Sequence, residues 1–365
     1  MRFLFIIDTL ETGGAERMVL SLAESLIKVG NDVSLLVLRD SICLDVPKNI
    51  DLHVLNCKKI SFAPYNLIYA FLMRRYINEL EAKGGIFDLI AANLNLSYRL
   101  SHISGIKNAY YCIHEAVSIS SLSRRTGLKK YFRKLRLKRI LNGKNIITVS
   151  VGIKDDLLDV VGIKPGSIRT IYNGVCFGRI ISMADMYESD IKADYVVHVG
   201  RLNKQKRQDV LLKAFKQSGA DCKLVLVGEG PERKDIEKEI ERLGLEEQVL
   251  MTGNVENPYP IIKNAMLMLL SSDYEGLPTV LLESFVLSTP VVSVDCYYGP
   301  REILGEKYGD YLAKHGDVKD LAEKISLGID DVKHGRLIAS PEHVRKFAIE
   351  SVADEYINLA KRNDI

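Results

Sequence analysis

The sequence lacks a long apolar run, and its cysteines follow no pairing pattern. No stretch approaches the roughly 18 uninterrupted apolar residues typical of a transmembrane helix, so we expect no membrane-spanning segment. The apolar opening at residues 3–7 ends at Asp8, which makes it too short for a signal peptide. Six cysteines are scattered without a C-x-x-C pair or a nearby histidine cluster. This distribution argues against a zinc site or a disulfide scaffold and favours reduced thiols in a cytoplasmic protein.

Three ligand-binding motifs are also missing. Gly13 and Gly14 follow the first apolar run, but Met18 occupies the position of the last glycine in a G-x-G-x-x-G dinucleotide fingerprint. The sequence contains no G-x-x-x-x-G-K-[ST] phosphate loop and no Asp-x-Asp motif beside a strand. We therefore expect no dinucleotide cofactor and no bound metal ion.

The 365 residues instead contain a regular alternation of short apolar runs and segments with helical spacing. Runs typical of buried parallel strands occur in both halves of the chain. They lie at residues 3–7, 33–38, 89–92, 110–113, 146–149, 168–172, 195–199, 223–227, 249–251, 266–270 and 291–294. This alternation predicts an α/β protein made of two Rossmann-like, doubly wound domains that face a cleft.

The length also favours two domains, because single cores stop growing at about 250–300 residues. We place the first domain at 1–180 and the second at 181–345, with a polar linker in 178–194. We expect residues 346–365 to form a C-terminal helix that packs back on the first domain.

Loops after two strands of the second half carry residues suited to phosphate. Gly200, Arg201 and Lys206 follow the run 195–199, and Gly228-Glu229-Gly230-Pro231 follows the run 223–227. Ligands of doubly wound sheets bind beyond the carboxyl ends of the strands, so these residues should share one edge. Arginine and lysine there predict an anion site.

A third loop, from Ser271 to Pro278, leads into a helix whose first residue we expect to be Pro278. The free N–H groups of its first turn, from Thr279 onward, suit a phosphate. Each feature alone also fits an ordinary solvated surface, and two glutamates eight positions apart, such as Glu275 and Glu283, are common in charged proteins.

The order and spacing of the whole set resembles glycosyltransferase family 4, the retaining enzymes of GT-B fold. The resemblance covers nearly the full chain and is strongest over 195–304. Besides the three loops, the matching segments are Gly13–Arg17, Asn173–Val175 and Gly299–Ile303. Two departures are Gln205, where the family often has glutamate, and Cys176-Phe177, where an aspartate often follows the Asn-Gly-Val motif.

The resemblance implies roles for the matched positions. Arg201 and Lys206 would hold the donor diphosphate, Glu275 the sugar hydroxyls, and Glu283 the ribose. His114, directly after the run 110–113, matches a family histidine near the donor sugar, although a lone histidine is often structural. Further donor-binding positions are Gly13, Gly14, Gly200, Gly228, Gly230, Asn254, Val255, Gly276, Leu277, Pro278 and Thr279.

The resemblance also implies front-face attack, in which the departing phosphate oxygen accepts the acceptor's proton. Fixed cations and amide dipoles would stabilise the growing charge without a metal. We expect a hexose or N-acetylhexosamine, best from a UDP-sugar, to pass to a growing lipid-linked surface glycan. Three alternatives remain open: a nucleotide-sugar 2-epimerase, a non-catalytic nucleotide-sugar-binding protein, and a nucleic-acid binder. The last is suggested by a single charged segment, and we expect no nucleic-acid partner.

That segment runs from 116 to 154 and contains eleven lysines or arginines but no aspartate or glutamate. Leu128, Tyr131, Phe132 and Leu135 recur in it at helical spacing, which predicts an amphipathic helix. The helix either packs on the first domain with a solvated basic face or binds the anionic inner face of the cytoplasmic membrane. The cations proposed for membrane contact are Lys129, Lys130, Arg133 and Lys134; Arg124 and Arg125 precede them.

Overall fold

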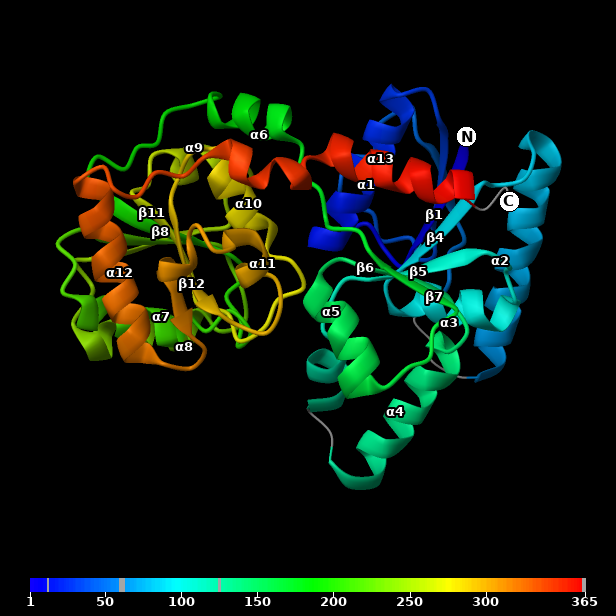
Figure 1. Ribbon diagram of the computed structural model, residues 1–365, viewed down its shortest axis with the longest axis horizontal. Helices are drawn as coiled ribbons and strands as arrows, with labels where there is room; N and C mark the ends of the chain where they lie inside the picture. The colour runs from blue at the N-terminus through cyan, green and yellow to red at the C-terminus, as the bar shows by residue number, and fades with distance from the viewer. Residues whose placement is uncertain (12, 59–62, 124–125, 363–365) are drawn as a thin grey trace. The chain divides into compact units, whose positions relative to one another are not determined.

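The computed structural model describes residues 1–11, 13–58, 63–123 and 126–362 (Figure 1). The chain divides into two compact units. The first consists of Met1–Val175 together with Ile349–Ile365, and the second of Cys176–Ala348. Arg124 and Arg125 of the basic segment lie outside the described residues.

A seven-stranded parallel sheet forms the centre of the first unit, in the order β3-β2-β1-β4-β5-β6-β7. The strands are β1 Arg2–Ile7, β2 Asp32–Val37, β3 Asp51–Val54, β4 Leu89–Asn93, β5 Ala109–Ile113, β6 Asn145–Thr148 and β7 Ser167–Thr170. Central strand β1 pairs with β2 and β4, and its residues 3–7 are at most 1% exposed. Burial on both faces explains why this strand is continuously apolar rather than alternating.

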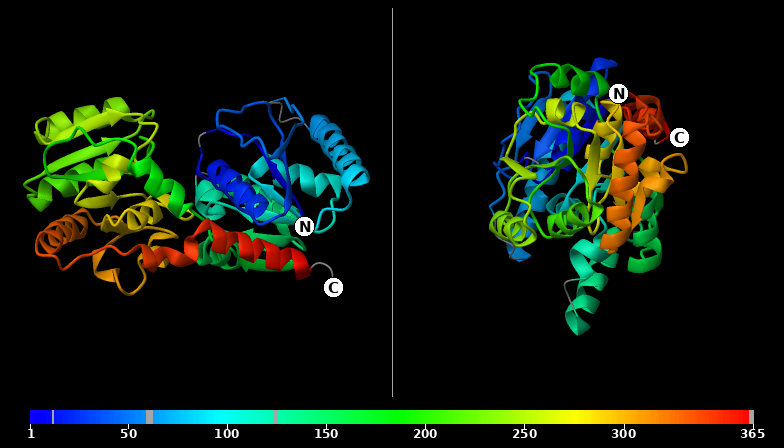
Figure 2. Two further views of the ribbon diagram at one scale, coloured as in Figure 1. Left: turned by 90° about the horizontal axis from the view of Figure 1, so that it is seen from above. Right: turned by 90° about the vertical axis from the view of Figure 1, so that its left-hand side faces the viewer.

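Helices cover both faces of this sheet (Figure 2). They are α1 Gly14–Lys28, α2 Ala63–Gly84, α3 Asn95–Ser104, α4 Gly127–Leu141, α5 Val151–Asp155 and α13 Ile349–Lys361, with short π-helical turns at Ser118–Ser123 and Asp156–Val161. The last helix, α13, packs against α1. Gly174 makes this return possible, because a Cβ there would lie 2.9 Å from the Cα of Ile349.

The second unit has a six-stranded parallel sheet in the order β10-β9-β8-β11-β12-β13. Its strands are β8 Tyr195–Val199, β9 Lys223–Val227, β10 Val249–Gly253, β11 Leu267–Leu270, β12 Val291–Asp295 and β13 Leu312–Lys314. Its α-helices are α6 Phe177–Ala184, α7 Gln208–Ser218, α8 Arg233–Leu243, α9 Tyr259–Lys263, α10 Thr279–Val286, α11 Pro300–Leu304 and α12 Val318–Lys333.

The predicted fold class, two doubly wound α/β domains, is confirmed. Two strands were not anticipated: β3, which is short and half-exposed at the sheet edge, and β13, which has three residues. The stretch 178–194, expected as a polar linker, begins within helix α6, and its residues 185–194 form no helix or strand. Helix α6 packs on α9 and α10 of the second unit because its apolar face is buried there.

Candidate functional site

The sheet of the second unit reverses its strand order between β8 and β11. Strand β9 lies on one side of β8, and β11 lies on the other. The carboxyl ends of two strands at such a reversal leave a crevice where ligands bind. The loops that follow β8 and β11 carry Arg201, Lys206 and Glu275, so these predicted site residues lie beside the switch point.

Lys206 and Glu275 meet directly, although they lie 69 positions apart in the sequence. The Lys206 Nζ donates to Glu275 Oε1 at 2.7 Å, and both side chains are largely buried. The Ser272 hydroxyl donates to the same oxygen at 2.6 Å. Two donors on one oxygen fix the Glu275 carboxylate in place and leave its other oxygen available to a ligand.

The backbones of the two loops are also cross-linked. The Asp273 N–H donates to the Gln205 carbonyl at 2.8 Å, and the Gln205 side-chain amide donates to the Tyr274 carbonyl at 2.8 Å. Ser271 donates its hydroxyl to the Lys206 carbonyl. A glutamate at position 205 could not donate to the Tyr274 carbonyl when ionised, so glutamine has a structural role at this departure from the family.

Arg207 is a member of the site that the sequence analysis missed. Its backbone is left-handed, with φ of 51°, and its guanidinium donates to Asp273 Oδ1 at 2.8 Å and to Asp209 at 3.0 Å. These two carboxylates raise the pKa of Arg207, so the guanidinium stays charged and holds the loop after β8 to the loop after β11. Its position directly after Lys206 was the feature of the sequence that could have identified Arg207.

His198 and Gln208 lie beneath the loop after β8. The Gln208 amide donates to the Arg201 carbonyl at 3.1 Å and contacts His198 Nε2 at 3.2 Å. The other ring nitrogen of His198 donates to the Leu269 carbonyl at 3.0 Å, which links β8 to β11. Burial lowers the pKa of His198 to about 4, so the ring is neutral at pH 7. The Arg201 side chain itself is exposed above this support.

The glycines after β9 serve loop packing. A Cβ at Gly228, where φ is 141°, would overlap the Gly200 carbonyl oxygen, and a Cβ at Gly230 would overlap the Leu202 carbonyl oxygen. Gly200 has more room, with its nearest neighbour, Lys206 Cε, at 3.4 Å. The glycine pattern therefore holds the loops after β8 and β9 in contact.

Helix α10 starts one residue later than expected, because Pro278 is the residue before the helix and Thr279 is its first residue. Leu277 and Pro278 are buried, whereas Gly276 and Thr279 are partly exposed. Glu283 lies one turn into α10 and is half-buried. The positions expected to face the base, Asn254 and Val255, follow β10, and β9 separates that strand from β8.

In the first unit, His114 follows β5 and is fixed by Asn93, which ends β4. Its Nε2 lies 2.9 Å from Asn93 Oδ1, while the Asn93 amide donates to the Ala91 carbonyl at 3.1 Å. That arrangement makes His114 Nε2 the protonated nitrogen. Burial lowers the pKa of His114 to about 4, and the neighbouring Asn173 opposes this shift. His114 is therefore neutral at pH 7, and Asn173 of the Asn-Gly-Val motif belongs beside it.

The switch point of the first sheet, between β1 and β4, is occupied by Asp8. Its carboxylate accepts the N–H groups of Leu96 and Ser97 at 2.8 Å, and the Ser97 hydroxyl at 2.7 Å. Asp8 thereby caps α3 from the end of β1, a role that the sequence analysis did not predict. Burial raises the pKa of Asp8.

Gly13 and Gly14 differ in the space around them. A Cβ at Gly13 would overlap the Glu16 carboxylate, whereas a Cβ at Gly14 would meet nothing within 4 Å. Glu16 is buried beside Gly13, and this burial raises its pKa. A phosphate near these glycines would approach at Gly14, where the backbone is open.

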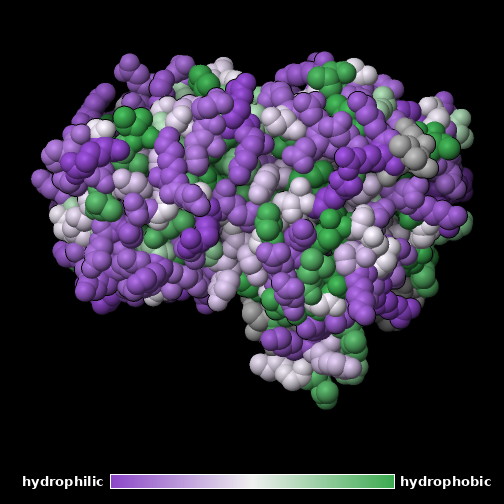
Figure 3. Space-filling view, in the orientation of Figure 1, coloured by the Kyte–Doolittle hydropathy of each residue, from purple (hydrophilic) through white to green (hydrophobic). Residues whose placement is uncertain are grey.

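Helix α4 carries the predicted membrane residues, and it extends away from the rest of the first unit (Figures 1 and 2). It packs by Leu137 and Leu141, while Leu128, Phe132 and Leu135 remain 74%, 63% and 44% exposed. Lys129 and Lys130 are exposed, but Arg133 donates to the Ser121 hydroxyl and Lys134 to the Val160 carbonyl. The apolar side chains are therefore turned to solvent, and Figure 3 shows apolar surface on this projection.

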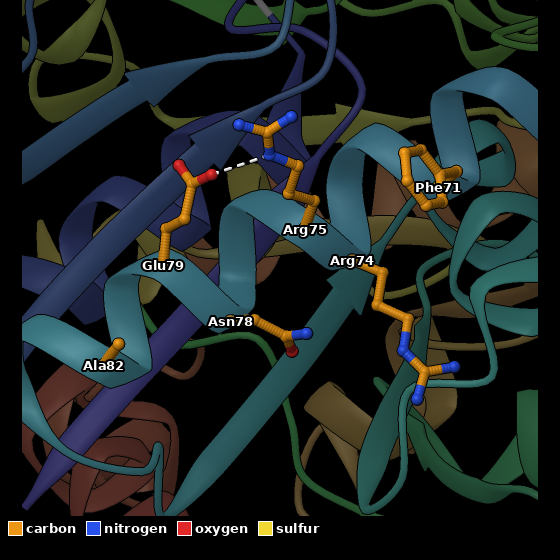
Figure 4. A pocket seen from close by; sticks show the side chains of 6 residues that line it. All are labelled: Phe71, Arg74, Arg75, Asn78, Glu79 and Ala82. Carbon is orange, nitrogen blue, oxygen red and sulfur yellow. Dashed lines mark hydrogen bonds and ion pairs between the residues drawn. The ribbon is translucent and has the colours of Figure 1, made fainter.

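An open pocket on α2 is a weaker candidate (Figure 4). Its lining comes from one helix face: Phe71, Arg74, Arg75, Asn78, Glu79 and Ala82. Arg75 is paired with Glu79 at 2.8 Å, and Arg74 donates to the Ser104 carbonyl at 3.0 Å. Because its arginines already have partners and no strand-end loop contributes, this pocket lacks the features of a donor site.

Within the described ranges, no helix combines the length and hydropathy needed to cross a membrane. In the same residues, no three histidine, cysteine, aspartate or glutamate side chains converge as metal ligands.

Comparisons with known proteins agree with this architecture. The family model "Glycosyltransferase Family 4" matches residues 12–179, and "Glycosyl transferases group 1" matches residues 185–340. Anabaena HepE in complex with UDP superposes with a TM-score of 0.77 at 20% identity, covering 99% of this chain and 100% of that one.

Two relatives from Campylobacter jejuni span nearly the whole chain. One, 26% identical over 95% of both chains, is an N-acetylgalactosamine-N,N'-diacetylbacillosaminyl-diphospho-undecaprenol 4-alpha-N-acetylgalactosaminyltransferase. The other, 26% identical over 98% of both chains, is a GalNAc-alpha-(1->4)-GalNAc-alpha-(1->3)-diNAcBac-PP-undecaprenol alpha-1,4-N-acetyl-D-galactosaminyltransferase. Glycosyltransferase family models match both halves of the chain, and its two parallel sheets are those of the GT-B fold, so this chain is a glycosyltransferase.

Proposed function

We propose that this glycosyltransferase moves a hexose or N-acetylhexosamine from a UDP-sugar to a growing lipid-linked surface glycan, with retention of anomeric configuration. The observation that carries the proposal is the Lys206–Glu275 pair at the β8/β11 switch point. Full-length relatives that act on undecaprenol-linked sugars, and a UDP complex among the structural neighbours, support the choice of acceptor and donor.

Arg201 and Lys206 bind the donor diphosphate in this proposal. Arg201 is exposed and offers a planar fork of N–H donors suited to phosphate oxygens. Lys206 has three N–H donors and spends one on Glu275, so it can keep that contact and still donate to phosphate. The first-turn amides of α10 add dipoles of the same sign.

In the reaction, the bond between the anomeric carbon and the diphosphate oxygen breaks, and a bond to the acceptor oxygen forms on the same face. The acceptor hydroxyl gives its proton to the departing phosphate oxygen, which leaves as part of UDP. Arg201 and Lys206 stabilise the charge that grows on the diphosphate, which is the main electrostatic contribution available. Glu275, held by Ser272 and Lys206, orients the sugar hydroxyls.

We propose further that helix α4 holds the enzyme peripherally on an anionic membrane surface. Three large apolar side chains, Leu128, Phe132 and Leu135, are exposed on it beside exposed Lys129 and Lys130. Such a helix buries its apolar side in the lipid interface while cations attract anionic headgroups. A lipid-linked acceptor would be presented at the same surface.

The test of the central proposal is a thermal-shift screen with nucleoside diphosphates and their sugars, followed by transfer assays. UDP should raise the melting temperature more than GDP or ADP, because a ligand that binds the native state stabilises it. The anomeric configuration of the product is then read from the anomeric coupling constant in NMR. An inverted product would contradict retention, and conversion of the donor sugar without acceptor would indicate an epimerase.

A further inference from the structure

A second pocket in the first unit lies between helices α3 and α4, and we call it the arginine pocket. Three guanidinium groups line it: Arg99 from α3, and Arg133 and Arg136 from α4. The rest of its lining includes apolar side chains such as Ile113, Leu137 and Ile140. The site therefore combines concentrated positive charge with an apolar wall.

The segment that contributes Arg133 and Arg136 to this pocket carries no carboxylate of its own. No aspartate or glutamate occurs between residues 116 and 154. Among the described residues, neither Arg99 nor Arg136 forms an ion pair or a side-chain hydrogen bond. Asp8 attracts Arg99 electrostatically, but its oxygens already accept from Leu96 and Ser97.

Holding these groups together has a cost that is visible on Arg99. Burial and the neighbouring charge of Arg136 both lower the pKa of Arg99. Guanidinium groups remain charged even so, because their ordinary pKa is far above 7. An anion placed between them would relieve both the repulsion and the lost hydration.

Phosphate is the anion that fits this arrangement best. The planar guanidinium fork donates two parallel N–H bonds to a phosphate, and several forks can share one diphosphate. A free inorganic anion would leave the apolar wall of Ile113, Leu137 and Ile140 unused. An anion joined to an apolar chain would use both parts of the pocket.

The pocket also lies beside the expected acceptor side of the reaction. Ile113 directly precedes His114, and the α3 end of the pocket begins just after β4. Helix α4 then continues into its exposed apolar side chains, Leu128, Phe132 and Leu135. We infer that the arginine pocket binds the phosphate or diphosphate group of an acceptor whose anion is joined to an apolar chain. This inference rests on the proposed function, since it takes the bound molecule to be the acceptor of the same reaction.

Calorimetry with three probes tests the site directly. The probes are decyl diphosphate below its micelle concentration, inorganic diphosphate, and decyl maltoside as a neutral molecule with the same chain. We expect decyl diphosphate to bind more tightly than either of the others. Equal binding of decyl maltoside would overturn recognition of the anion, and equal binding of inorganic diphosphate would overturn the part played by the apolar chain.

Single substitutions then assign the residues. Arg99→Gln and Arg136→Gln should each weaken decyl diphosphate binding by about tenfold or more, the effect of losing a hydrogen bond to a charged group. Arg139→Gln is the matched control, because Arg139 lies on the same helix, is exposed, and does not line the pocket. Arg136 is exposed, so its substitution should not disturb folding even if that of Arg99 does. Equal affinities in the Arg136→Gln and Arg139→Gln proteins would overturn the inference.

UDP binding to the same proteins separates this inference from the proposed function. The donor residues belong to the second unit, so UDP affinity should be unchanged in all three variants. A wild-type protein that binds UDP but not decyl diphosphate would contradict the inferred role of the arginine pocket and would agree with the proposed donor site. A protein that binds decyl diphosphate through Arg99 and Arg136 but no nucleotide would contradict the proposed donor site instead.

Discussion

The loops after β8 and β11 and the helix α4 both hold several cations, but the surroundings of those cations differ. In the loops, Lys206 is paired with Glu275 and Arg207 with Asp273. On α4, Arg136 and its neighbours have no carboxylate within the segment 116–154. The loops are therefore fixed before a ligand arrives, as a site that stabilises developing charge requires. Helix α4 has the composition of a surface that is completed by an anionic partner.

Removal of the loop cations is expected to have the largest effect on activity. Arg201→Ala and Lys206→Ala should each lower turnover of the best donor by about 100-fold or more, as loss of one charge-stabilising donor does in other enzymes. Lys204→Ala, an exposed lysine of the same loop, should retain normal turnover. Steady-state kinetics and melting curves are measured together. Unchanged turnover in a normally folded Lys206→Ala protein would remove that residue from the site.

The two glutamates of the proposed donor site, Glu275 and Glu283, are expected to contact different parts of the donor. Glu283→Gln should weaken UDP binding by about tenfold, the scale of one charged hydrogen bond. Glu275→Gln should leave UDP binding unchanged and lower turnover, since Glu275 is expected to contact the sugar. Calorimetry with UDP alone separates the two, with Glu246→Gln, an exposed loop glutamate, as control. Loss of UDP affinity in the Glu275 variant with normal affinity in the Glu283 variant would reverse the roles.

Vesicle flotation tests the proposed binding of helix α4 to an anionic membrane. Lys129→Gln and Lys130→Gln should each weaken binding to vesicles that contain phosphatidylglycerol by about fivefold, since one nearby cation contributes about 1 kcal/mol. Arg133 and Lys134, which the sequence also suggested, are less suitable because both are engaged with the unit itself. A combined Leu128→Ser, Phe132→Ser and Leu135→Ser protein should bind less at every salt concentration.

The controls for flotation are lipid composition and a distant helix. Binding should fall as salt rises, because screening acts on exposed charges. Lys234→Gln and Lys238→Gln remove two exposed cations from α8 and should have no effect. Equal recovery with neutral and anionic vesicles would rule out the electrostatic part of the proposal.

The same two regions show what the sequence could predict. Fold class, most strands and the edge that carries Lys206 and Glu275 followed from apolar runs and from the rule for strand ends. The direct contact of those two residues did not, because it depends on β8 and β11 being neighbours across 69 positions. Edge strand β3 was missed since its residues are partly exposed and lack a buried apolar run.

Periodicity predicted an amphipathic helix at α4 but could not say which residues would pack. The structure buries Leu137 and Leu141 and exposes Leu128 and Phe132, so apolar residues occur on two sides of the helix. Likewise, the glycines after β9 were predicted to admit a ligand, whereas Gly228 and Gly230 primarily admit the neighbouring loop. Contacts between distant segments decided both cases, and local pattern does not contain them.

Acid should loosen the supported loops through His198. Burial lowers its pKa to about 4 from the ordinary histidine value of 6.5, so the unfolded state binds more protons between these two pH values. Stability from the neutral ring is complete above pH 6.5 and is lost as pH falls toward 4. His198→Asn keeps a donor for the Leu269 carbonyl but does not titrate, so its melting temperature should fall less from pH 7 to 5 than that of wild type. His334→Asn, at an exposed site, should behave as wild type does; equal pH dependence in all three proteins would contradict the role of His198.

The smallest expected effect is that of metal removal. If the paired and exposed cations of the loops suffice for the diphosphate, excess EDTA should leave turnover unchanged. In the proposed site, Arg201, Lys206 and the first turn of α10 would together supply the positive potential that a divalent cation supplies in metal-dependent transferases. The measurement compares initial rates after dialysis against EDTA with and without added manganese or magnesium. Complete loss of activity that either ion restores would show that the cations of these loops do not replace a metal. The loops would then differ from α4 only in how their cations are arranged, and not in supplying the charge that the diphosphate needs.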